Sequence, residues 1–193
     1  MKRLITLLAT VGLLLTARAD VETYQIDPVH SSTGFTVRHI LSKFTSSFTK
    51  TTGSITVDRD NLEKSSVEAT VVIASVSTAS EKRDGHLLSA DFFDAAKFPT
   101  ATFKSSAWKK TGENSFDVTG KLTIKDVTKE VVLHVSLNGF APGMKPGSTI
   151  SGWEATTVIK KSDFGVAGPA MLAKALGDEV TLNISIEAGY TKV

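Results

Sequence analysis

Charged and imidazole side chains that could perform chemistry gather at three places in this sequence. The first place holds Asp27 and His30, the second holds Arg38 and His39, and the third holds Arg83, Asp84 and His86. An aspartate beside a histidine can act as a general base, and three histidines brought together can bind zinc. Arginine presents a planar fork of N–H donors that suits a polar or anionic head group. These residue types therefore leave catalysis, a metal site built from the histidines, and head-group binding as alternatives.

The spacing of these residues supports neither a catalytic nor a metal-binding site. The sequence contains no H-E-x-x-H, G-x-S-x-G or P-loop pattern. It has no cysteine, which excludes thiol nucleophiles, thiolate metal sites and disulfides. A purely structural role is also open, in which Arg83, Asp84 and the histidines tie an irregular segment to the rest of the fold. We expect no catalytic residue, no metal ion and no cofactor.

The densest of the three places is the stretch Arg83-Asp84-Gly85-His86-Leu87, followed by Asp91, Phe92, Phe93 and Asp94 and closed by Phe98-Pro99. It interrupts a chain that otherwise alternates between apolar and polar residues. Two roles are open for its phenylalanines. They form a small core under the segment, or they form a lid or mouth for an apolar ligand tail.

The alternation around this stretch predicts half-buried antiparallel strands, because side chains in a strand point to opposite faces in turn. The apolar parity predicts burial of Val71, Ile73, Leu122, Ile124, Leu133, Val135, Leu182 and Ile184. About eight strands with short connections indicate an all-β fold. We expect a single antiparallel lipocalin-like barrel with a short helical insert, although periodicity alone also fits a sandwich.

Two connections are longer than a turn. Residues 78–99 form the insert, with a helix start at Thr78 or Ser80 ahead of Glu81. We expect this insert to cover one opening or flank of the barrel. Residues 165–177 form the second connection, in which the segment from Pro169 to Leu176 predicts two helical turns.

The N-terminal residues predict export. A basic start, an apolar run from Leu4 to Leu15 and an A-x-A site ending at Ala19 have the layout of a secretory signal peptide. We expect residues 1–19 to be removed between Ala19 and Asp20, leaving residues 20–193 as one periplasmic or secreted domain. Three of the 22 basic residues lie in this leader, so 19 remain against 20 acidic residues. This balance argues against a nucleic-acid partner, and no membrane span remains after cleavage.

Several spaced motifs resemble those of the YceI-like family over nearly the whole mature chain. They are residues 26–31, 35–39, 53–57, 77–78, 83–87, 91–94, 98–99, 118–124 and 163–165. The resemblance implies a lipocalin-like barrel that is exported, usually to the periplasm, and that binds polyisoprenoid chains, isoprenoid quinones or fatty amides. One departure concerns Lys161, which stands where the family usually has arginine and lacks the planar fork.

The sequence and the resemblance together favour a carrier of a long-chain amphiphile. The expected head-group residues are Arg38, His39, Arg83, Asp84, His86 and Lys161. The expected tail or lid residues are Phe35, Phe92, Phe93, Phe98 and Phe164. A homodimer is possible. The alternatives are a rigid β-domain whose core is filled and whose surface binds a protein partner, and, third, an enzyme of unknown reaction.

Overall fold

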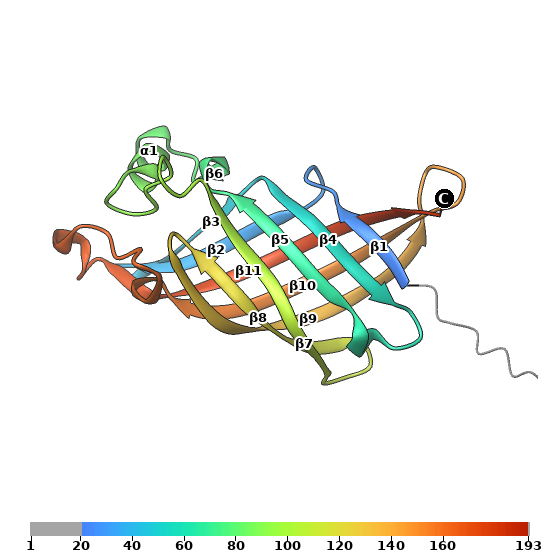
Figure 1. Cartoon of the computed structure of the whole chain (residues 1–193). Coiled ribbons are helices and arrows are strands. Elements are labelled where there is room, and N and C mark those ends of the chain that lie inside the picture. The colour runs from blue at the N-terminus through green and yellow to red at the C-terminus, as the bar shows by residue number, and fades with distance from the viewer. Residues whose placement is uncertain (1–20, 193) are drawn as a thin grey trace, which may run out of the picture.

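The computed structural model describes residues 21–192, in which eleven antiparallel strands form one sheet (Figure 1). The strands are β1 (Val21–Ile26), β2 (Ser32–His39), β3 (Ser42–Phe48), β4 (Thr51–Asp58), β5 (Ser66–Val72), β6 (Val76–Ser77), β7 (Thr100–Lys110), β8 (Ser115–Ile124), β9 (Val127–Pro142), β10 (Ser148–Lys160) and β11 (Leu176–Thr191). The signal peptide expected at residues 1–19 and its cleavage after Ala19 lie outside the described residues. Within residues 21–192, no helix is long and apolar enough to cross a membrane.

The sheet closes on itself as a barrel with eight strand positions. Strands β1 and β2 occupy one position, because both pair with the same edge of β11. Strands β3 and β4 occupy the next position, since β3 pairs with β2 and β4 pairs with β1. Strands β5 and β6 occupy the third, and β7 to β11 complete the ring. The expectation of a single antiparallel barrel of about eight strands is confirmed.

The interior face follows the alternation of the sequence, but the interior is not filled. All eight residues expected to be buried point inward and line internal cavities. Ile73, Leu122, Leu133 and Val135 are buried. The prediction of burial is wrong for Val71, Ile124, Leu182 and Ile184, which are half-buried. The alternation places a side chain inside the barrel but does not fix how closely its neighbours cover it, and these four keep part of their surface uncovered.

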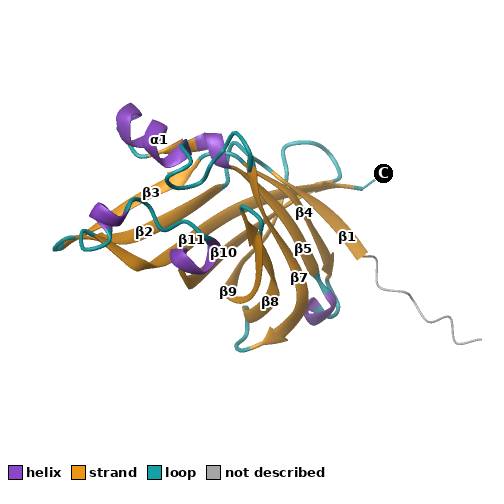
Figure 2. Ribbon diagram, turned by 60° about the vertical axis from the view of Figure 1, so that its left-hand side comes forward, coloured by secondary structure: helices purple, strands orange, loops and turns teal. Residues whose placement is uncertain are grey.

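The two ends of the barrel differ. One end carries the β2–β3 turn, residues 78–99, the β8–β9 turn and residues 161–175, and we call it the mouth (Figures 1 and 2). The opposite end is packed with aromatic rings, among them Tyr24, Phe140 and Trp153. Arg59 lies 3.9 Å from the centre of the Phe140 ring and donates to Glu22 and to Tyr24 Oη, each at 2.7 Å. Burial, with the hydrogen bond to Glu22, raises the pKa of Tyr24 to about 12, so its hydroxyl stays protonated as a donor.

The insert over the mouth contains the α-helix of the described chain, α1 (Glu81–Leu88), which begins after Ser80 as expected. Asp84 accepts a hydrogen bond from the backbone N–H of Thr78 at 2.9 Å and another from the Thr78 hydroxyl. After α1 the chain turns back, and Phe93 N–H donates to Leu87 C=O at 3.1 Å. Figure 2 shows the insert at one rim of the barrel.

The second long connection differs from the prediction. Instead of two helical turns from Pro169 to Leu176, one 3₁₀ turn forms at Ala170–Leu172. Beyond it, the C=O of Ala175 accepts a hydrogen bond from the N–H of Ile40 at 2.7 Å, and Leu176 pairs with His39. The segment therefore joins the sheet beside β2, and these backbone bonds replace the ones a longer helix would make.

Candidate functional site

The barrel encloses two apolar cavities that adjoin each other along its axis. The deeper cavity has a volume of about 110 Å³, and the cavity at the mouth has a volume of about 300 Å³. Five residues line both of them, namely Thr33, Val71, Ala101, Leu122 and Leu182. We call this ring of five residues the waist. The shared wall places the two cavities next to each other inside the barrel.

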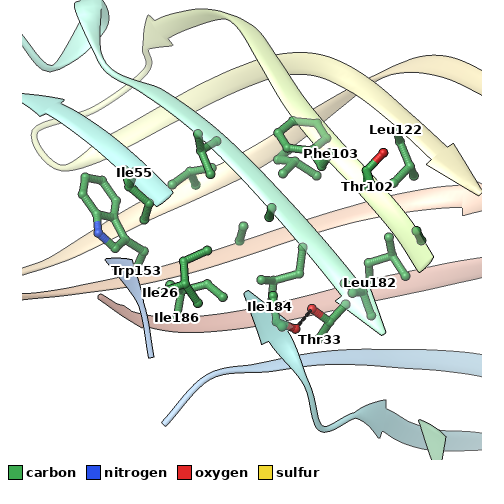
Figure 3. Close-up of a pocket in the computed structure, with 18 of the residues that line it drawn as sticks. Ile26, Thr33, Ile55, Thr102, Phe103, Leu122, Trp153, Leu182, Ile184 and Ile186 are labelled. Atoms are coloured by element: carbon green, nitrogen blue, oxygen red, sulfur yellow. Dashed lines mark hydrogen bonds between the residues drawn. The ribbon is translucent and has the colours of Figure 1, made fainter. Parts of the chain in front are cut away.

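The deeper cavity is walled almost entirely by hydrocarbon. Figure 3 shows Ile26, Ile55 and Trp153 at one end of it and Leu122 and Leu182 at the other. The hydroxyls of Thr33 and Thr51 bond to each other at 2.9 Å, so they are satisfied without a ligand. Such a wall favours an apolar guest, since a polar group entering it would lose its hydrogen bonds to water.

Aromatic rings dominate the wall of the mouth cavity. Phe35 and Phe48 lie 5.6 Å apart between ring centres, and Phe93 meets Phe48 edge-on at 5.6 Å. Phe92 and Phe164 are buried in the same wall. Four of the five phenylalanines expected at an apolar tail site, namely Phe35, Phe92, Phe93 and Phe164, therefore line one cavity.

Four of the six expected head-group residues line the same cavity, and they are His39, Arg83, His86 and Lys161. All four can carry positive charge. His86 Nε2 donates to Asp91 at 2.9 Å, and its ring meets Phe92 edge-on at 5.1 Å. Lys161 Nζ donates to the C=O of Ala167 at 2.9 Å and lies 3.9 Å from Asp178. Two basic side chains, Arg83 and Lys161, and two imidazoles thus lie at one end of an apolar space.

Three expected site residues lie elsewhere. The Arg38 side chain lies on the outer face of β2 and donates to the C=O of Ile40 at 2.7 Å. The Asp84 carboxylate accepts both of its side-chain hydrogen bonds from Thr78, the residue that follows β6. Among the described residues, it forms no hydrogen bond with a histidine. Phe98 lies outside the cavity with Lys97 Nζ 4.9 Å above its ring. These three side chains are therefore not part of the cavity wall.

Arg83 both holds the insert in place and lines the mouth cavity. Its Nε donates to the Thr78 hydroxyl at 2.9 Å, its Nη2 donates to the Thr78 C=O, and its guanidinium lies 4.3 Å from the centre of the Phe44 ring. These contacts attach α1 to the residue that follows β6 and to β3. The same side chain forms part of the cavity wall. Structural and ligand roles are therefore not exclusive at this residue.

Arg83→Ala is expected to lower the free energy of unfolding by about 1–2 kcal/mol, because two hydrogen bonds from a charged donor and one cation–π contact are lost. Arg83→Lys keeps the charge at the mouth but not the fork, so it should leave the stability loss largely in place. Urea unfolding followed by tryptophan fluorescence measures both variants. Lys82→Ala on the exposed face of the same helix is the control. Stability unchanged in Arg83→Ala would contradict the structural role.

The histidines are not gathered into a metal site as the sequence alternative required. His39 and His86 line the mouth, whereas His30 lies at the break between β1 and β2. There, His30 Nδ1 donates to Asp27 at 2.9 Å and lies 3.8 Å from Glu187. The hydrogen bond and charge of Asp27 raise the pKa of His30, and the same hydrogen bond lowers the pKa of Asp27. This exposed triad joins the strand break to β11.

Several residues of the mouth were not predicted from the sequence. Phe44 lines it, although its alternation with Phe48 along β3 could have placed it there. Lys125 was also missed, and its Nζ donates to the C=O groups of Phe92 and Gly165, both at 3.1 Å. No local pattern gives this role, because it depends on three segments that meet only in the fold.

Comparison with known proteins agrees with the barrel fold. The model of the YceI-like domain matches residues 24–188. The chain belongs to the YceI-like family. A UPF0312 protein of Pseudomonas syringae pv. tomato is 34% identical over 184 residues, which cover 93% of this chain and 95% of that protein. The crystal structure of Burkholderia cenocepacia BcnA is similar with a TM-score of 0.74 and 25% identity, covering 84% of this chain and 99% of BcnA.

A more distant likeness concerns the fold alone. A polyisoprenoid binding domain from Saccharophagus degradans has a TM-score of 0.65 and 16% identity, covering 88% of this chain and 98% of that domain.

One feature of this YceI-like chain fixes Phe92 in the mouth wall. Gly168 has φ +76°, and a Cβ there would come within 2.6 Å of the Phe92 ring. Only glycine allows the connection after β10 to pass this close to the ring. The insert and the second connection therefore pack against each other across one side of the mouth.

Proposed function

We propose that the barrel holds a long-chain amphiphile, with its apolar tail in the two cavities and its polar head at the mouth. The observation that carries this proposal is the hollow interior, which is apolar from Trp153 to Phe93 and bears cationic groups at one end only. A domain that served only as a rigid protein-binding surface would gain stability from a filled core. Two adjoining apolar cavities are instead what a long guest needs.

The cavities suit a flexible chain better than a compact ligand. About 300 Å³ lies at the lower end of the range of ~300–1,000 Å³ found for ligand pockets, and the deeper cavity beyond the waist adds about 110 Å³. Each buried CH₂ contributes about 0.8 kcal/mol, so ten buried carbons supply roughly 8 kcal/mol before ordering costs. The tail alone thus accounts for useful affinity, and head-group selectivity is expected to be loose.

The head group is proposed to be neutral and polar or anionic, because the titratable residues of the mouth wall are His39, Arg83, His86 and Lys161. Polyisoprenoids, isoprenoid quinones and fatty amides meet this requirement. The Saccharophagus degradans domain, described as polyisoprenoid binding, supports the view that this architecture is compatible with such a ligand. Export to the periplasm or out of the cell belongs to the same proposal and depends on removal of residues 1–19.

Native mass spectrometry of protein purified without detergent from its own host tests the proposal. We expect a mass above that of the chain and, after solvent extraction, a free long-chain lipid. The stripped protein should then take up a fluorescent isoprenoid analogue. Absence of both a co-purified lipid and uptake of the analogue would refute the carrier function.

A further inference from the structure

The turn between β2 and β3 exposes two large apolar side chains at the mouth. Leu41 is 98% exposed and Ile40 is 54% exposed. Met171, 85% exposed, belongs to the neighbouring connection, which is bonded to this turn through Ile40 N–H and Ala175 C=O. We call Ile40, Leu41 and Met171 the apolar tip. Figure 1 shows the β2–β3 turn and residues 161–175 at the same end of the barrel.

The backbone of this turn has a positive φ at a residue that is not glycine. His39 pairs with Ser42, so Ile40 and Leu41 form a two-residue hairpin loop. Ile40 has φ +52°, and tight hairpin turns with positive φ at the first loop residue normally carry glycine there. A β-branched residue in this region is a rare outlier. Folding alone would favour glycine, so the isoleucine calls for another explanation.

Basic residues flank the apolar tip. Arg38 and Lys43 are directly opposite each other across β2 and β3, a like-charge pair that is unfavourable in a sheet. Lys174 lies next to Ala175 in the neighbouring connection. Among residues 21–192, no carboxylate lies within ion-pair distance of Arg38, Lys43 or Lys174. Asp178, on the adjacent strand, is held by Ser162 at 2.7 Å and by Lys161.

We infer that the apolar tip docks on the surface of an anionic phospholipid bilayer, with Leu41 inserted among the acyl chains and Arg38, Lys43 and Lys174 against the phosphates. A protruding turn with apolar side chains offers no groove for a partner, but it can enter the boundary between head groups and acyl chains. Basic residues beside it are attracted to an anionic leaflet. Because the tip borders the mouth cavity, docking would bring the opening to the membrane; this transfer role rests on the proposed function.

Co-sedimentation with phospholipid vesicles tests the inference. A protein that begins at Asp20 keeps every strand and helix of the barrel and lacks the apolar leader. We expect it to bind vesicles of phosphatidylglycerol and phosphatidylcholine, and to bind pure phosphatidylcholine less by roughly fivefold for each basic residue engaged. Leu41→Asn should reduce binding to the anionic vesicles about tenfold. Equal binding of this variant and the wild type, or no binding to either vesicle, would overturn the inference.

Two further variants exclude trivial explanations. Ile40→Gly relieves the strained φ, so it should fold at least as stably as the wild type and yet bind vesicles more weakly. Met144→Gln alters a fully exposed methionine in the loop at the opposite end and should bind like the wild type. Uptake of the isoprenoid analogue in solution, without vesicles, is expected to be unchanged in Leu41→Asn. Vesicle binding without uptake of the analogue would refute the carrier function and leave the docking surface standing.

Discussion

Replacing Gly53 with alanine is expected to lower the free energy of unfolding by about 3–5 kcal/mol, a large part of the ~5–15 kcal/mol of a typical domain. Gly53 lies in β4 with φ +139° and pairs with Ala69 on the neighbouring strand β5. A Cβ there would overlap the carbonyl oxygen of Glu68 and come within 2.8 Å of the Ala69 Cα. Both atoms belong to the backbone, so β4 and β5 must separate to admit the methyl group.

Urea unfolding followed through the buried Trp108 and Trp153 measures this loss, with hydrogen exchange at β4 and β5 to locate it. The same substitution at Gly85 is the control. Gly85 lies in α1 with no atom within 4 Å of the added Cβ, so Gly85→Ala should raise stability by about 1 kcal/mol. A Gly53→Ala protein as stable as the wild type would show that the two strands can move apart at little cost.

The strands could be predicted from the sequence because apolar residues recur at every second position, on the face that points into the barrel. Val71, Leu122 and Ile184 all have the inward parity that the alternation assigned to them. Whether they meet other side chains or empty space could not be predicted. That depends on the circumference of the closed sheet, which no single strand encodes. The half-buried state of Val71 and Ile184 is a consequence of closure.

The mouth was predicted in part for a related reason. His39 and Phe35 follow from parity along β2, and both line the cavity. The insert has no such periodicity, so the sequence could not distinguish Arg83, which lines the cavity, from Asp84, which turns away to Thr78. Lys125 and Gly168 were missed because their roles depend on contacts between segments far apart in the chain.

Blocking the waist is expected to have the largest effect on ligand binding. Ala101 lies on β7 opposite Val71, and both line the two cavities. In Ala101→Phe the added ring should enter the waist, where the two cavities adjoin, and close the deeper cavity to a ligand tail. If four or five methylene groups are excluded at about 0.8 kcal/mol each, the affinity for a long-chain amphiphile falls by on the order of 100-fold or more.

A series of ligands that share one head group and differ in chain length separates this mechanism from general damage to the protein. In the wild type, affinity should rise with each added carbon until both cavities are full. In Ala101→Phe the rise should stop at the length that fills the mouth cavity, while the shortest ligands bind as before. Lys104→Phe places the same ring on the outer face of β7, where Lys104 is exposed, and should follow the wild-type curve. Parallel curves for wild type and Ala101→Phe would mean that the tail never passes the waist, because only a tail that crosses it can sense the block.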